Sequence, residues 1–80
     1  MKIVRVLWQD AQSDDGWNDK EKMDKWAKEP LPLCDTVGWL HSESDDTILV
    51  IGTTSPDEYM HCLKIPKAWI TKMEILKETG

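Results

Sequence analysis

Apolar and β-branched residues gather in five short stretches of the chain, and turn-forming residues separate them. The stretches cover residues 2–8, 36–43, 47–54, 59–65 and 70–76 and are rich in valine, isoleucine, leucine and threonine. Prolines and runs of aspartate and serine fill the intervals between the last four. Five short strands in a chain of 80 residues predict a mainly-β fold, a small, strongly bent five-stranded antiparallel barrel.

Two of these strands depart from simple alternation of apolar and polar positions. In the first strand, Ile3 is followed by Val4, Val6 and Leu7, so that both faces of the strand are expected to be partly covered. Residues 48–51 form a continuous apolar run, which suits a strand buried on both faces or one at a subunit interface. The residues that we predict at an oligomer interface are Ile48, Val50 and Tyr59.

The loop after the first strand contains the one helical pattern of the chain, at residues 19–28. Asn18 is placed to cap this helix, with Glu21 three residues on as its capping-box partner. Met23 and Trp26 share one face at helical spacing. A helix of this length is marginal on its own, so we expect the Met23 and Trp26 face to pack on the barrel.

Length and composition indicate a single domain over residues 1–80 with a marginal core. No run of about 18 apolar residues is present, which argues against a membrane span. The N-terminal segment lacks the apolar region and cleavage site of a signal peptide, so we expect a cytoplasmic protein. In that compartment Cys34 and Cys62 are expected to be reduced, small buried residues.

Charge is unevenly distributed along the chain, whose formal net charge is −5. Residues 9–58 contain thirteen acidic side chains and four lysines, whereas residues 59–77 contain four lysines and one glutamate. The basic segment could attract phosphate locally, and Lys64 and Lys67 are its best candidates for phosphate contact. The alternative is that these lysines are solvated side chains that keep the barrel soluble.

The five tryptophans are unusual in a chain without phenylalanine. Indole rings can stack on nucleobases, but they also supply bulk to small cores and to subunit interfaces. Trp17 lies in a loop rich in glycine and aspartate, so it is the tryptophan that we expect outside the core and the third candidate for nucleic-acid contact.

Candidate catalytic and metal-binding groups do not form a recognisable set. The pairs Asp14–Asp15 and Asp45–Asp46 lie in turns, where aspartate is favoured for local hydrogen bonds. His61 and Cys62 are neighbours on one strand, so their side chains are expected on opposite faces. The two cysteines and two histidines lack the spacing of a zinc site, and no phosphate or dinucleotide motif occurs. We therefore predict a non-enzymatic protein without metal or cofactor.

Three sequence elements carry a resemblance to a known group. They are Trp8-x-Asp10-Ala11-x-Ser13 after the first strand, Thr36-Val37-Gly38-Trp39-Leu40 in the second, and Ile65-Pro66-Lys67 before the last. The pattern resembles small uncharacterised proteins of phage or marine-metagenome origin whose barrel is similar to that of the Sm, LSm and Hfq proteins. This resemblance implies a homo-oligomeric ring formed by strand pairing, RNA binding at loops that face the pore, and a host cytoplasm as the location of a phage protein.

Two functions of different classes follow from the sequence. The first is a non-enzymatic Sm-like module that forms homo-oligomers, with RNA or single-stranded DNA as a candidate ligand. The second is an acidic SH3-like protein-interaction module, such as a phage protein acting on a host factor, in which the acidic segment would contact a basic partner.

Overall fold

The computed structural model describes residues 1–78, which form five strands and two short helical segments. In chain order the elements are β1 (Lys2–Gln9), α1 (Lys20–Ala27), β2 (Leu33–Glu43), β3 (Thr47–Thr54), β4 (Tyr59–Pro66), the 3-10 helix η1 (Lys67–Trp69) and β5 (Ile70–Glu78). Each strand lies within three residues of its predicted bounds. The predicted mainly-β class, with one α-helix after the first strand, is confirmed.

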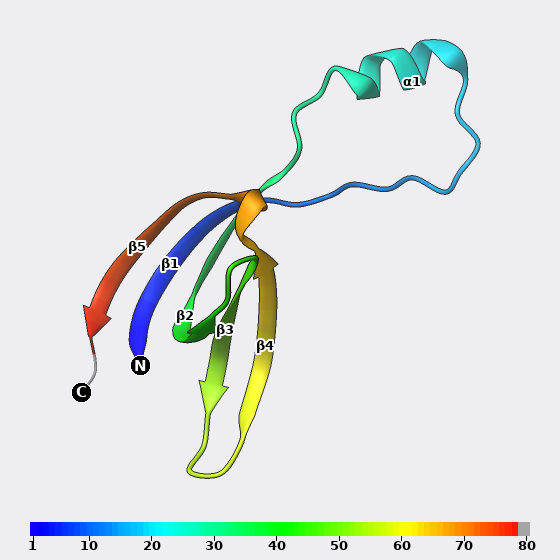
Figure 1. Cartoon of the computed structure of the whole chain (residues 1–80). Coiled ribbons are helices and arrows are strands. Elements are labelled where there is room, and N and C mark those ends of the chain that lie inside the picture. The colour runs from blue at the N-terminus through cyan, green and yellow to red at the C-terminus, as the bar shows by residue number, and fades with distance from the viewer. Residues whose placement is uncertain (79–80) are drawn as a thin grey trace.

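All five strands belong to one antiparallel sheet with the order β4-β3-β2-β1-β5 (Figure 1). Strands β1 to β4 pair in chain order, and β5 then returns to the free side of β1. β4 and β5 are therefore the two edges of the sheet, and no pairing joins them within residues 1–78. The predicted closure into a barrel is thus not confirmed.

Strand β2 curves strongly and changes its pairing partner along its length (Figure 1). It pairs with β1 from Leu33 to Leu40 and with β3 from Trp39 to Glu43. Gly38 lies just before the second pairing begins. A Cβ atom there would lie 2.6 Å from the carbonyl oxygen of Ile51, so the approach of β3 requires a residue without a side chain.

The core lies between the two halves of this bent sheet. Its fully buried members are Val4 and Val6 on β1, Ile48 and Val50 on β3, and Ile65 on β4; Ile51 on β3 is also buried but lies outside this cluster. Four partly buried apolar residues surround them: Trp8, Leu40, Leu63 and Ile70. So few buried side chains make a core that depends strongly on each of them.

The N-cap of helix α1 is one residue later in the chain than the sequence predicts. The carboxylate of Asp19 accepts a hydrogen bond from the backbone N–H of Lys22 at 2.8 Å, which makes Asp19 the N-cap. The prediction that Asn18 caps the helix is wrong, since its amide donates instead to the Gly16 carbonyl at 3.2 Å. Asparagine and aspartate cap equally well, so adjacent residues of these types cannot be separated by preference alone.

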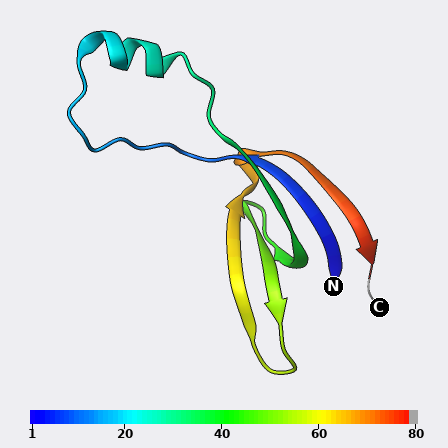
Figure 2. The ribbon, with the colours of Figure 1, turned by 180° about the vertical axis from the view of Figure 1, so that it is seen from behind.

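Residues 10–32 form an arm that leaves the sheet after β1 and returns to it at β2 (Figures 1 and 2). The N–H of Asp10 donates to the Pro32 carbonyl at 3.2 Å, which extends the β1–β2 ladder by one step into the neck of the arm. This continuation directs the arm away from the sheet. In both views α1 stands apart from the strands, and none of its residues is buried. The expectation that the Met23 and Trp26 face packs on the barrel is therefore wrong.

The arm makes the molecule long and narrow. Its principal extents are 54 × 24 × 21 Å, and its radius of gyration is 16.4 Å. A compact domain of this length would have a radius of gyration of about 12 Å. The sheet alone is a small folded unit, and the arm offers a second, separate surface.

Candidate interaction surfaces

The two edges of the sheet are the first candidate surface. An edge strand presents a row of backbone N–H and C=O groups without sheet partners, and these groups can pair with a strand of another chain. Apolar side chains accompany both edges. Tyr59 and Met60 on β4 are 53% and 60% exposed, and Ile75 and Leu76 on β5 are 55% and 51% exposed. The edges therefore combine open hydrogen-bonding groups with uncovered apolar area.

The structure separates the three residues predicted at an oligomer interface. Ile48 and Val50 are each 2% exposed and belong to the core of the single chain. Their side chains are covered by β1 and β4 and have almost no area left for a second subunit. Tyr59 lies on the edge strand, where its ring meets that of His41 edge to face at 5.4 Å between centroids. Of the three, Tyr59 alone offers its side chain to a partner.

The three residues predicted to contact nucleic acid do not form one site. Lys64 is exposed on β4, while Lys67 in η1 forms an ion pair with Glu43 at 3.1 Å. Trp17 belongs to the arm, in the loop between β1 and α1. Its side chain is fully exposed, at 103% of the reference value.

Ion pairs neutralise most of the positive charge on the sheet. Within residues 1–78, four of the basic side chains outside the arm have an acidic partner within 4 Å; the pairs are Lys2–Glu78, Arg5–Asp35, Lys67–Glu43 and Lys72–Glu74. A surface that binds phosphates needs several cations free of such partners. Of the two lysines predicted to contact phosphate, Lys67 belongs to one of these pairs and Lys64 does not.

The outer face of the β1–β2 hairpin, opposite the core, is the second candidate surface. Residues directly opposite each other in an antiparallel pair share a face, so Leu7 and Asp35, Arg5 and Val37, and Ile3 and Trp39 all lie on this side. Leu33 and Val37 are 60% and 56% exposed there. Apolar residues therefore occur on both faces of β1, which explains why apolar and polar positions do not alternate strictly in this strand.

A hollow of about 220 Å³ lies in this outer face. Its lining consists of Ile3, Val37, Gly38, Trp39 and Gly52. The lining contains no charged side chain, and two of its members are glycines that leave the backbone uncovered. The hollow is shallow and open to solvent. The sequence marks its lining residues only as members of strands, so pattern analysis could not reveal that they come together.

Arg5 and Asp35 form a two-pronged ion pair on the same face. Arg5 Nε donates to Asp35 Oδ1 at 2.9 Å, and Arg5 Nη2 donates to Oδ2 at 2.7 Å. The hydrogen bond from Arg5 is the main reason why the pKa of Asp35 lies below its ordinary value. Nearby, a hydrogen bond from Lys72 likewise lowers the pKa of Glu74.

This pair predicts an acid-dependent contribution to stability. Because the pKa of Asp35 is lowered by folding, its contribution is complete above the unfolded pKa of about 3.9 and disappears as the pH falls through the lower folded value. We expect Asp35→Asn to lower the thermal midpoint slightly at neutral pH and to match the wild type in strong acid. Thermal scans of both proteins across this range provide the measurement, with the exposed turn variant Asp57→Asn as the control. Equal separation of the Asp35 curves at every pH would contradict the assignment.

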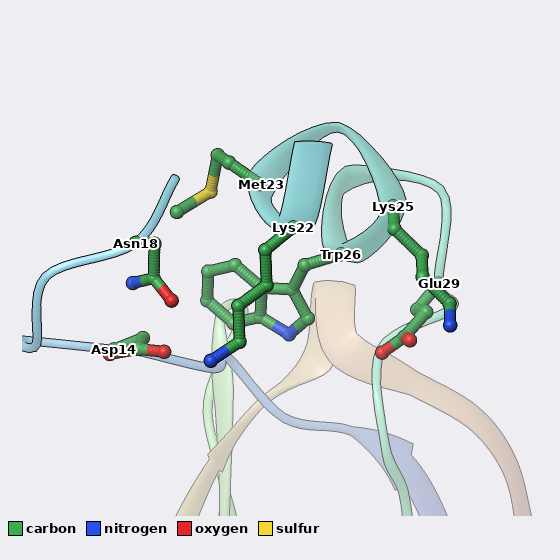
Figure 3. Close-up of a pocket in the computed structure, with 7 residues that line it drawn as sticks. All are labelled: Asp14, Asn18, Lys22, Met23, Lys25, Trp26 and Glu29. Carbon is green, nitrogen blue, oxygen red and sulfur yellow. The ribbon is translucent and has the colours of Figure 1, made fainter. Parts of the chain in front are cut away.

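The arm contains a pocket of about 250 Å³ between α1 and the loop before it (Figure 3). Seven residues line it: Asp14, Asn18, Lys22, Met23, Lys25, Trp26 and Glu29. The Trp26 indole extends from the helix toward the loop, and the Lys22 side chain lies beside it (Figure 3). Asp14 accepts the Gly16 N–H at 2.9 Å, which is the main cause of its lowered pKa. These contacts give the arm a local structure of its own.

Residues that could ligate metal are dispersed. Within residues 1–78 no group of three or more histidine, cysteine or acidic side chains is arranged to hold a metal ion. Cys34 and Cys62 are free thiols, but Cys34 is only partly buried and Cys62 is exposed, so the expectation that both are buried is wrong. In the same part of the chain, no helix has the length and apolar character needed to cross a membrane.

Comparison with protein-family models, with curated proteins and with solved structures gives no match to this chain.

Proposed function

We propose that the protein is a non-enzymatic Sm-like module, which forms homo-oligomers when β5 of one copy pairs with β4 of the next. The observation behind this proposal is the sheet order β4-β3-β2-β1-β5, which leaves two long edges open within residues 1–78. Because the two edges belong to different strands, the contact is head-to-tail, and such contacts close into rings or continue as filaments.

The exposed surface supports association. The chain exposes 6330 Å², whereas a folded monomer of 9.3 kDa is expected to expose about 5000 Å². The difference, about 1300 Å², exceeds the roughly 800 Å² that each partner contributes to an interface of standard size. A second chain would therefore remove from water an area that the single chain leaves uncovered.

The proposal is tested by placing a charge on each edge. Ile75→Glu on β5 and Met60→Glu on β4 alter exposed side chains, so the folded sheet should persist while strand pairing weakens. We expect each variant to raise the dissociation constant at least tenfold in sedimentation equilibrium. Asp45→Lys, in the exposed turn between the inner strands β2 and β3, is the control, because it changes charge away from both edges.

Two results would remove the proposal. One is a wild-type chain that sediments as a monomer at all accessible concentrations. The other is an oligomer whose mass and dissociation constant are unaffected by both edge variants. Nucleic-acid contact through Lys64 stays a separate prediction, because the edge pairing does not depend on it.

A further inference from the structure

Trp17 extends into solvent, and the outer face of the β1–β2 hairpin contains a hollow that could receive a side chain of this kind. A tryptophan side chain that is 103% exposed leaves its whole indole in water, which is unfavourable for a ring of that size. The hollow, at about 220 Å³, is smaller than the 300 to 1,000 Å³ typical of small-molecule sites, so its size suits one large side chain. We propose that Trp17 of one copy inserts into the outer-face hollow of a second copy.

The direction of the arm indicates that the hollow receives Trp17 of a second copy and not Trp17 of its own chain. The arm and the outer face start from the same hairpin, and the Asp10–Pro32 hydrogen bond continues that hairpin outward. In both ribbon views the loop of residues 10–19 runs away from the strands (Figures 1 and 2). Two copies related by a two-fold axis can each supply an arm to the other, so that both tryptophans and both hollows are used.

The charges of the arm and of the outer face, and the low stability of α1 on its own, support this exchange of arms between two copies. Residues 10–32 contain seven acidic and four basic side chains, and the outer face presents Arg5, Lys72 and Lys77 against Asp35 and Glu74. The arm thus has a net charge of −3 and the face a net charge of +1, since Asp35 and Glu74 pair with two of its three cations. An isolated helix as short as α1 is unstable in water, so docking of the arm would also stabilise α1.

The contact goes beyond edge pairing and does not require it. Edge pairing uses β4 and β5, whereas the arm contact uses residues 10–32 and the far side of β1 and β2. The two contacts can therefore be tested by separate substitutions.

Cross-linking between differently substituted copies tests the contact directly. In a background with Cys34→Ser and Cys62→Ser, one copy keeps Trp17 and receives Asp15→Cys beside it, and a second copy of different mass receives Leu33→Cys, which is exposed on the outer face but does not line the hollow. A short bismaleimide can then join the two positions only between chains. We expect the mixed cross-linked dimer to dominate, and a control pair in which the Asp15→Cys copy also has Trp17→Ala to give little of it.

Sedimentation supplies the second measurement. Trp17→Ala changes a fully exposed side chain and cannot disturb the fold, so a rise of about tenfold or more in the dissociation constant reports the lost contact. Trp17→Phe should restore most of the affinity, because the ring is retained. In the edge variant Ile75→Glu, the arm contact should persist as a dimer that Trp17→Ala then dissociates.

Each contrary result has a definite meaning. If Trp17→Ala leaves the dissociation constant unchanged, or the mixed cross-link does not form, the arm contact is overturned while edge pairing is untouched. If both edge variants leave the mass unaltered but Trp17→Ala dissociates the oligomer, edge pairing fails and the arm contact stands. If the fluorine signal of a fluorotryptophan at position 17 shifts only on addition of RNA and not with protein concentration, the indole serves nucleic acid and the arm contact is overturned.

Discussion

Replacing Gly38 with alanine is expected to lower the thermal midpoint by about 10 to 20 °C. The new Cβ would lie 2.6 Å from the Ile51 carbonyl oxygen and 2.7 Å from Val50 Cγ1. The first contact is with backbone, so it can be relieved only by moving β3 away from β2. Overpacking of this kind costs about 1 to 3 kcal/mol or more, and each kcal/mol shifts the midpoint of a domain of this size by about 4 to 8 °C.

The matched control is Gly16→Ala in the arm. A Cβ there would meet only the side-chain oxygen Asp14 Oδ1, at 3.3 Å, and that group can move. We expect its midpoint to stay close to that of the wild type. Thermal scans followed by circular dichroism at one protein concentration compare the two variants, since the stability of an oligomer depends on concentration. A Gly38→Ala midpoint equal to that of Gly16→Ala would show that β3 does not approach β2 so closely.

The strands were predictable because local and tertiary preferences agree in them. Runs such as residues 47–54 combine β-branched residues with flanking turn formers, and the sheet uses them as the sequence indicates. The residues predicted to form turns between these strands also form them in the structure. Ser44 Oγ accepts the Thr47 N–H at 3.1 Å, and Ser55 Oγ accepts the Glu58 N–H at 3.0 Å, so each serine closes the turn that it begins.

Features that depend on the path of the chain in space could not be predicted. The amphipathic spacing of Met23 and Trp26 correctly indicates a helix, but it does not specify where the apolar face lies. Met23 and Trp26 line a pocket between α1 and the loop before it, so the apolar face lies within the arm, which the spacing of the two residues does not reveal. The outer hollow likewise arises from the register of β1 and β2, and register is not visible in either strand alone.

One segment shows the limit of hydrophobic runs as indicators of interfaces. The run of residues 48–51 is equally compatible with burial within a chain and with burial between chains. The register decides between them, because Ile48 lies opposite Ile65 and Val50 opposite Leu63 on the neighbouring strand β4. Both pairs face the core of the same chain, so the run contributes to folding before it can contribute to assembly.

Truncating Ile48 to alanine should therefore reduce the stability of the single chain. A buried isoleucine replaced by alanine costs about 2 to 5 kcal/mol, while a domain of this length has about 4 to 12 kcal/mol of stability in total. Few other buried side chains can compensate in so small a core. We expect the urea midpoint to fall by more than about 1 M, and Ile48→Val to lose only about 0.5 to 1.5 kcal/mol.

The control for this substitution is Leu31→Ala at the neck of the arm, where the side chain is 48% exposed and a truncation removes much less buried area. An interface role for Ile48 makes the opposite prediction: the alanine variant would keep its urea midpoint under conditions where the protein is monomeric, and it would lose only its self-association. Urea denaturation and sedimentation of the same three variants separate these outcomes, because a core residue changes the first measurement whether or not a second copy is present.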